Sequence, residues 1–567
     1  MAKEMLLLIV RVVLVCSVLV SFLNEEIICQ NTFPKREFRA VFIATVNNLD
    51  FPSNSFLSTQ AQKEEFISIL NRLSNARFNA VFVQVRPAAD AFYESSLEPW
   101  SEWLTGKQGE APRPYYDPLA FMVEECHKRG IEIHAWLNPY RAVQSSSSNV
   151  CFQHITKRKP EWFFQYEGAT YFDPGHPEAR KFIVDVIADI VSRYDIDGIH
   201  FDDYFYPYPN GKLFTQDYPT FYKYKGNFSY LDDWRRNNVN QLIREVSEII
   251  RSINPRIKFG VSPYGIWREK SVSDEGSETR IGQSCYDHLY ADVRLWLQKG
   301  WIDYVAPQLY QHTKYERAPF KKMVQWWEKN CFGKHLYISH AMYRYMIEEG
   351  EWQNKEEMYE QVRFVRSRKE TLGSVFYSYS KLALNKGKFF DFLRDEFYQY
   401  PALPPTMPWI DSIPPLPPVQ LYITEHPLGN KLSWLSPSEA KDGEKPFRYV
   451  VYAIPKQHTP NLENPSYIVG ILPATQTEFL HVFRRNYPGE EPFQYYVTSL
   501  DRLHNESMPW SEELEAFYKT SEVSDEKFPL NFVVSDEYPY LSIHIQYFYY
   551  QTLEMLKEWL HLSEKSY

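Results

Sequence analysis

The sequence predicts an α/β protein, a (β/α)8 barrel followed by a small all-β sandwich, and three observations carry this prediction. The chain has 567 residues, which is more than a single hydrophobic core usually organises. Between about residues 39 and 392, short β-branched or aromatic runs alternate with longer amphipathic stretches, the pattern of βα units around a parallel sheet. A proline-dense segment then gives way to short strands at close spacing, which is typical of a sandwich.

The first segment of the chain indicates export. Lys3 precedes a run over residues 5–22 that is mostly apolar, interrupted by residues such as Arg11 and Ser17, so we expect a signal peptide over residues 1–29. Cys29 is a candidate lipid anchor, but the small residue expected directly before such a cysteine is absent, so anchoring is not favoured. The expected location is therefore the periplasm, the cell surface or the medium.

Eight strands are expected in the first domain, which we place at residues 34–400. They cover residues 39–46, 80–86, 131–137, 198–202, 258–262, 304–308, 336–340 and 374–378, with helices expected at 62–76, 118–128, 177–193, 236–252 and 291–298. An open doubly wound sheet is the alternative, but the sequence lacks a glycine-rich phosphate turn. The pattern therefore favours a TIM barrel, in which reactive groups gather after the strands.

A second domain follows a linker. Residues 401–418 are too rich in proline to continue a helix or a sheet and indicate a semi-rigid spacer. Six short strands are expected beyond it, at residues 419–424, 431–434, 447–454, 467–472, 478–482 and 493–500. This pattern predicts a fibronectin-III-like β-sandwich over residues 419–520, and we assign no role to the tail at 521–567.

Composition narrows the class of ligand. The formal net charge of -10 argues against nucleic acid as the main partner, and 17% aromatic residues suit either sugar stacking or core packing. The cysteines show no CxxC spacing, and the histidines form neither an i,i+4 pair nor an HExxH motif, so we expect no metal and no cofactor. A GxSxG elbow is also absent, which leaves acyl transfer without a nucleophile.

The strongest candidate for catalysis is a carboxylate pair, Asp202 and Asp203, at the end of the fourth expected strand. Adjacent strand residues point to opposite faces, so one carboxylate is expected to enter the barrel mouth while the other braces a neighbour. A capping or salt-bridging pair is the alternative. Asp197 precedes the strand and is expected to be structural.

Seven strings, in order along residues 36–310, carry a specific resemblance. They are REFRAVFIATVNN (36–48), QVRPAADAFY (84–93), PWSEWLTG (99–106), WLNPYR (136–141), FDPGHPE (172–178), DGIHFDDYFYPY (197–208) and APQLY (306–310). With them, the region from about Lys35 to Lys388 resembles the glycosyl-hydrolase-like 10 family of bacterial envelope proteins. The resemblance implies a TIM barrel, export and action on bacterial glycan, with peptide-free peptidoglycan strands as the family-level substrate.

A glycosidase normally needs two carboxyl groups, one as acid and the other as nucleophile or base. We expect Asp202 in the second role. Residues 261–267, after the fifth strand, offer no glutamate where many related retaining barrels carry one, so the acid stays open among Asp90, Asp173 and Asp203. For Asp90 and Asp173, bracing of a loop is an equal alternative.

A sugar-binding rim is expected from polar and aromatic residues at or after the strands: Arg86, Asn138, Tyr140, Arg141, His200, Tyr204, Tyr264, Trp267, Gln308 and Tyr310. Amide and guanidinium groups pair with sugar hydroxyls, and aromatic faces lie against pyranose rings. For the arginines, a buried ion pair with a barrel carboxylate is the alternative.

The sequence thus predicts a glycoside hydrolase that takes a polysaccharide substrate, with the sandwich domain serving spacing, stability or weak contacts. Two alternatives stay open. A non-catalytic carbohydrate-binding barrel would bind glycan without turnover, and a polysaccharide lyase or deacetylase would leave different products.

Overall fold

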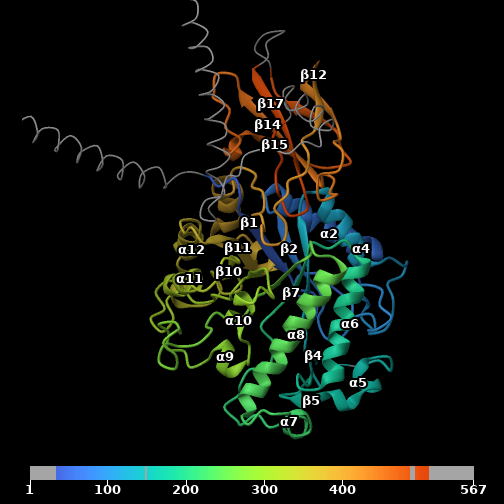
Figure 1. Cartoon of the computed structure of the whole chain (residues 1–567), viewed down its shortest axis with the longest axis vertical. Helices are drawn as coiled ribbons and strands as arrows, with labels where there is room; N and C mark the ends of the chain where they lie inside the picture. Colours follow the sequence, from blue (N-terminus) through green and yellow to red (C-terminus); the bar gives the residue numbers. More distant parts are fainter. Residues whose placement is uncertain (1–32, 147, 149, 485–491, 510–567) are drawn as a thin grey trace, which may run out of the picture. The chain divides into compact units, whose positions relative to one another are not determined.

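The computed structural model describes residues 33–146, 148, 150–484 and 492–509 (Figure 1). The expected signal peptide, Cys29, the last residues of the expected sandwich and the tail at 521–567 lie outside this set. Within it, Cys126, Cys151, Cys285 and Cys331 are free thiols. None of the helices in the described ranges is both long and apolar enough to cross a membrane.

Eight parallel strands close into a barrel in the order β1-β11-β10-β9-β8-β7-β3-β2, which confirms the TIM-barrel prediction. Each predicted strand overlaps one of them. The strands are β1 (Phe38–Ile43), β2 (Ala80–Arg86), β3 (Glu132–Leu137), β7 (Gly198–Phe201), β8 (Lys258–Val261), β9 (Tyr304–Val305), β10 (His335–Ala341) and β11 (Thr371–Tyr377).

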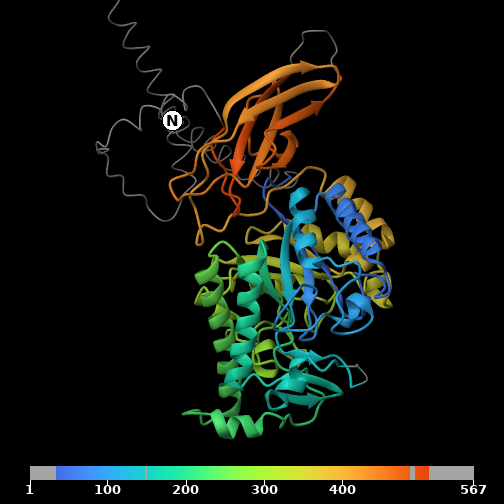
Figure 2. The same ribbon diagram turned by 90° about the vertical axis from the view of Figure 1, so that its right-hand side faces the viewer.

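Helices surround the barrel on its outside. They are α2 (Thr59–Asn75), α3 (Glu102–Thr105), α4 (Pro118–Lys128), α5 (Ile155–Arg158), α6 (Pro177–Arg193), α7 (Tyr218–Tyr224), α8 (Leu231–Ile253), α9 (Cys285–His288), α10 (Val293–Gln298), α11 (Phe320–Glu328), α12 (Glu356–Arg366), α13 (Tyr379–Ala383) and α14 (Phe389–Phe392). Local signals explain where they begin: Asp117 caps α4 by accepting from Ala120 N, and Pro118 and Pro177 occupy first turns. The long helices α6 and α8 lie side by side (Figures 1 and 2).

The barrel has two apolar layers, because successive strand residues point to opposite sides. Outward-facing residues such as Val41, Val81 and Ile133 pack against the helices, while Phe38, Phe82 and other inward-facing residues fill the interior. The barrel interior is therefore a packed core and not an open channel.

One long loop carries structure that the sequence pattern did not predict. Between β3 and α6, the strands β4 (Arg141–Val143), β5 (Phe163–Tyr166) and β6 (Ala169–Phe172) form a small antiparallel sheet in the order β4-β6-β5. Two residues of the predicted site, Arg141 and Asp173, therefore belong to this sheet or follow it.

The second domain consists of two three-stranded antiparallel sheets, which confirms the predicted all-β module. The sheets have the orders β12-β13-β16 and β15-β14-β17, from β12 (Val419–His426), β13 (Gly429–Leu435), β14 (Arg448–Pro455), β15 (Ile468–Pro473), β16 (Glu478–Val482) and β17 (Phe493–Leu500). Their core contains Leu432, Trp434, Tyr449 and Val497. The fibronectin-like classification stays a prediction.

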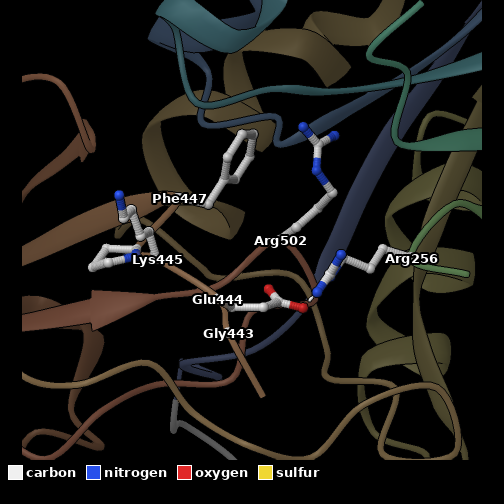
Figure 3. A pocket seen from close by; sticks show the side chains of 7 residues that line it. Arg256, Gly443, Glu444, Lys445, Phe447 and Arg502 are labelled. Atoms are coloured by element: carbon white, nitrogen blue, oxygen red, sulfur yellow. Dashed lines mark hydrogen bonds and ion pairs between the residues drawn. The ribbon is translucent and has the colours of Figure 1, made fainter. Parts of the chain in front are cut away.

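Residues of the sandwich contact the N-terminal ends of the barrel strands. Arg502 donates to Asp197, directly before β7, at 3.2 Å, and Arg256, before β8, pairs with Glu444. A pocket of about 250 Å³ lies at this junction, and Figure 3 shows the Arg256–Glu444 pair within it. Its lining is Arg256, Gly443, Glu444, Lys445, Pro446, Phe447 and Arg502. It therefore lies at the opposite end of the strands from Asp202.

Candidate active site

Asp202 and Asp203 directly follow β7, and both are buried, with 4% and 5% of their surface exposed. Asp202 Oδ2 accepts hydrogen bonds from the indole of Trp136 and the amide of Asn138, each at 3.1 Å. Asp203 Oδ1 accepts from the amide of Gln308 at 2.9 Å, and its Oδ2 accepts from the Tyr208 hydroxyl. The two carboxyl groups therefore turn to different neighbours, Asp202 toward the β3 side and Asp203 toward the segment after β9.

Burial and mutual repulsion shape the ionisation of this pair. Burial, together with the charge of Asp203, raises the pKa of Asp202 to about 7, although Arg141 and the Trp136 hydrogen bond oppose the rise. Burial also raises the pKa of Asp203, against the hydrogen bonds from Tyr208 and Gln308. Asp202 thus retains its proton in a substantial fraction of molecules at neutral pH, which is a property of a general acid.

Aromatic side chains surround the two carboxyl groups. The Arg141 guanidinium lies 5.1 Å from the ring centre of Tyr204, and the Tyr204 and Tyr208 rings meet edge to face at 5.7 Å. Burial raises the pKa of Tyr264 and of Tyr310, and the charge of Asp203 adds to both rises. These rings, which derive from different strand ends, give the site apolar faces beside its acids.

Asp90 lies in the loop after β2 and braces it. Its carboxylate accepts from the backbone of Ala88 and the side chain of Gln108, both at 3.2 Å. Burial raises its pKa to about 7. These contacts are those of the loop-bracing alternative.

Asp173 follows β6 and braces the start of α6. Its Oδ1 accepts from Gly175 N at 2.9 Å, and its Oδ2 accepts from the Thr220 hydroxyl. Burial raises its pKa to about 7 as well. The side-chain partners of Asp173 therefore belong to α7 and to the turn before α6, and not to the ends of the barrel strands.

Arg86 forms a buried ion pair. It donates to both carboxylate oxygens of Glu98, and its Nη1 donates to Asn138 O at 2.6 Å. Asn138 in turn accepts from Arg141 N at 2.9 Å while it donates to Asp202. Arg86 therefore supports the Asn138 backbone, and through it the donor that holds Asp202.

Three other predicted rim residues are buried. Tyr140 is buried in the outer core, and Trp267 donates to Asp292 at 3.2 Å and stacks on Trp326. His200 lies inside the barrel below the pair and is fully buried. Tyr310, by contrast, is half-buried after β9, with its hydroxyl 3.1 Å from the Ser339 hydroxyl.

Trp136 and Tyr208 contact the carboxyl pair but were not predicted from the sequence. A signal for Trp136 existed, because it lies two residues before Asn138 and therefore faces the interior from β3. No comparable signal existed for Tyr208, which reaches Asp203 through the bend after β7.

In the described part of the chain, one cluster of three acidic residues has the spacing of metal ligands. Asp411, Asp442 and Glu444 bring ligand oxygens within 4.8 Å of one another, but Glu444 already pairs with Arg256. The group lies in the linker and the sandwich, so it is not part of the site around Asp202.

Two proteins with sequences similar to this chain are both glycosyl hydrolases by name. Glycosyl hydrolase YngK of Bacillus subtilis is 41% identical over 492 residues, covering 84% of this chain and 93% of that protein. Glycosyl hydrolase DigH of Escherichia coli K12 is 39% identical over 325 residues, covering 54% of this chain and 73% of that protein.

A solved structure, the glycoside hydrolase domain of PgaB from Bordetella bronchiseptica, aligns with a TM-score of 0.42 and 14% identity, over 64% of this chain and 98% of that one. The sequence profile of the glycosyl hydrolase-like 10 family matches residues 37–359, which span the barrel strands from β1 to β10. The chain therefore belongs to the glycosyl hydrolase-like 10 family.

Proposed function

We propose that this protein is a glycoside hydrolase that cleaves bacterial polysaccharide, with peptide-free peptidoglycan strands as the first substrate to test. The observation that carries the proposal is the buried pair of Asp202 and Asp203 at the C-terminal end of the barrel strands. Membership of a glycosyl hydrolase-like family supports a glycosidase-type function.

The ionisation of the pair supports a division of roles. Hydrolysis needs one carboxyl group that protonates the leaving oxygen and a second that acts as base or nucleophile. A pKa of about 7 suits Asp202 to the role of the acid. The sequence alone favours Asp202 as the nucleophile or base instead. Asp203 takes the second role, because hydrogen bonds from Tyr208 and Gln308 favour its charged form.

The surroundings of the pair support a sugar ligand. Tyr204, Tyr264 and Tyr310 are half-buried, so each offers part of its ring to a ligand. Pyranose rings present apolar faces to aromatic side chains, and their hydroxyl groups pair with the nearby Arg141.

The export prediction is consistent with such a substrate. The apolar run after Lys3 is the support for it, and peptidoglycan lies outside the cytoplasm. We therefore propose that the protein acts in the periplasm or at the cell surface.

Product analysis tests the proposal. The full chain is incubated with peptide-free peptidoglycan strands and with neutral bacterial glycans, and the products are identified by mass spectrometry. We expect shorter oligosaccharides that have gained water, and a loss of at least a hundredfold in rate for Asp202→Asn. The matched control is Asp173→Asn, which changes a carboxylate of similar raised pKa that contacts Thr220 and Gly175 instead.

Other results would point to the alternatives. Glycan that is retained without new products by the wild type would favour a binding barrel. Unsaturated or anhydro ends would indicate a lyase, and loss of acetyl groups alone would indicate a deacetylase.

A further inference from the structure

A line of buried polar side chains begins at the N-terminal ends of the barrel strands. Glu132 on β3 accepts hydrogen bonds through its Oε1 from Lys258 on β8 and from His504 of the sandwich. Glu132 Oε2 lies 3.1 Å from Nε2 of His134. On the other side of that ring, His134 Nδ1 lies 2.8 Å from the hydroxyl of Tyr304 on β9.

The line continues to the proposed catalytic pair. The Tyr304 hydroxyl lies 3.0 Å from Nδ1 of His200, and His200 Nε2 lies 2.9 Å from the Ser262 hydroxyl. The carbonyl of Ser262 accepts from Gln308 Nε2 at 3.0 Å, and the same nitrogen donates to Asp203. From Glu132 to Ser262, no member of the line is more than 1% exposed.

The chemistry of the members gives the line one direction. Burial lowers the pKa of His134 and of His200, so each ring is neutral and has one donor and one acceptor nitrogen. Lys258 and His504 hold the pKa of Glu132 well below its usual value, although burial alone would raise it. Glu132 is therefore charged, and a charged carboxylate accepts hydrogen bonds but donates none.

His134 must therefore donate from Nε2 to Glu132 and accept at Nδ1 from the Tyr304 hydroxyl. The Tyr304 oxygen is left to accept from His200 Nδ1. His200 Nε2 then accepts from the Ser262 hydroxyl, so every donor in the line points toward Glu132.

Two glycines make room for these rings. A Cβ atom at Gly198 would lie 2.4 Å from His134 Nδ1, and one at Gly260 would lie 2.2 Å from the Tyr304 ring. Neither position tolerates such an approach, so side chains are absent from β7 and β8 where the rings cross the interior. The hydrogen-bonded line therefore depends on residues of four strands, β3, β7, β8 and β9.

We propose that this line, composed of Glu132, His134, Tyr304, His200 and Ser262, positions Gln308 on Asp203. Fixing the His200 tautomer directs the Ser262 hydroxyl inward, and Ser262 then holds Gln308 through its carbonyl. Tyr304 and both histidines are positioning residues, because none of them touches the carboxyl pair in a described contact. The expected effect on the rate of hydrolysis rests on the proposed function. The expected tautomers of the two histidines do not depend on it.

The tautomers are read by ¹⁵N NMR on the full chain labelled at histidine, with signals assigned through His134→Gln and His200→Gln. We expect the proton on Nε2 in His134 and on Nδ1 in His200. In Tyr304→Phe, His200 loses its acceptor, and its two tautomers become mixed. Wild-type His200 protonated on Nε2 would overturn the proposal whatever the activity.

The kinetic test uses a matched pair of variants. Tyr304→Phe removes the hydroxyl in the middle of the line and keeps the ring, so we expect a loss of about tenfold in kcat with KM unchanged. Tyr337→Phe breaks a similar buried contact, to His335 at 2.8 Å, which lies outside the line, and should keep its kcat. Equal losses in both variants, or full kcat in Tyr304→Phe, would refute positioning. A wild type that turns over no glycan would refute the proposed function and leave the tautomer result standing.

Discussion

Asp202 and Asp203 are adjacent in the chain but bonded to different parts of the barrel. Asp202 takes its side-chain donors from Trp136 and Asn138, at the end of β3, and Asp203 takes one of its donors from Gln308, after β9. The negative charge of one carboxylate disfavours ionisation of the other, so the pair releases its protons in separate steps. At the scale of residues, this environment gives one carboxyl group a pKa near neutrality.

A pH profile tests this assignment. Arg141 favours the charged form of Asp202, so Arg141→Gln raises the Asp202 pKa above its value of about 7. If protonated Asp202 is the acid, the alkaline limb of kcat/KM moves to higher pH, by up to about one unit. The control Arg244→Gln removes an exposed arginine that pairs with Glu248 on α8, and should leave the limb in place. A limb that stays fixed or moves down in Arg141→Gln would contradict the acid role.

At the scale of elements, the eight barrel strands were predictable because each is a short run of β-branched or aromatic residues. The bounds of β2 were predicted to the residue, and β9 was predicted three residues too long, since its pairing as a strand ends at Val305. The segment after it nevertheless stays aligned, with Gln308 bridging Tyr264 and Ser339. Local pattern therefore located the strands, while pairing with neighbours decided where they end.

The sequence placed the carboxyl pair at a strand end but could not supply its partners. Glu98, which holds Arg86, comes from a loop whose course depends on tertiary packing. Tyr140 was expected at the rim but faces the outer core, because the chain turns after β3 into the small sheet of β4, β5 and β6. Side-chain direction beyond a strand end is thus fixed by loop geometry, which periodicity does not encode.

The barrel interior makes a stability prediction. Gly260→Ala places a Cβ 2.2 Å from the Tyr304 ring, and overpacking of this kind costs about 1–3 kcal/mol or more. Gly211→Ala has open space around the new Cβ, so its only cost is the backbone strain at a φ of 81°, which lowers the free energy of unfolding by about 1 kcal/mol. Urea unfolding should rank Gly260→Ala as clearly less stable than Gly211→Ala. Equal midpoints would mean that the strands shift to admit the methyl group.

At the scale of the whole molecule, the sandwich domain is in direct contact with the barrel. The sequence predicted the boundary at residues 401–418 but not these contacts, because they join residues that lie between 188 and 372 positions apart. Asp197, expected to be structural, is the centre of one contact: it accepts from Ile133 N, from His127 and from Arg502. The charges of His127 and Arg502 hold its pKa far below the usual value in spite of burial.

Loss of Arg502 should therefore destabilise the barrel as well as the sandwich. Arg502→Ala leaves Asp197 buried with one cation fewer, at a cost of about 2–4 kcal/mol, since Arg502 is only 13% exposed. Because a depressed carboxylate pKa adds stability above the unfolded pKa of about 4, the deficit should be largest near neutral pH and shrink as the pH falls below that value.

The control variant is Arg256→Ala. Arg256 lines the same pocket but is 39% exposed and pairs with Glu444, so its loss should cost less than about 1 kcal/mol. Thermal unfolding of both variants at pH 7 and at about pH 2.5, below the unfolded pKa, measures this dependence. Equal losses for the two arginines would show that the Asp197 contact does not couple the domains.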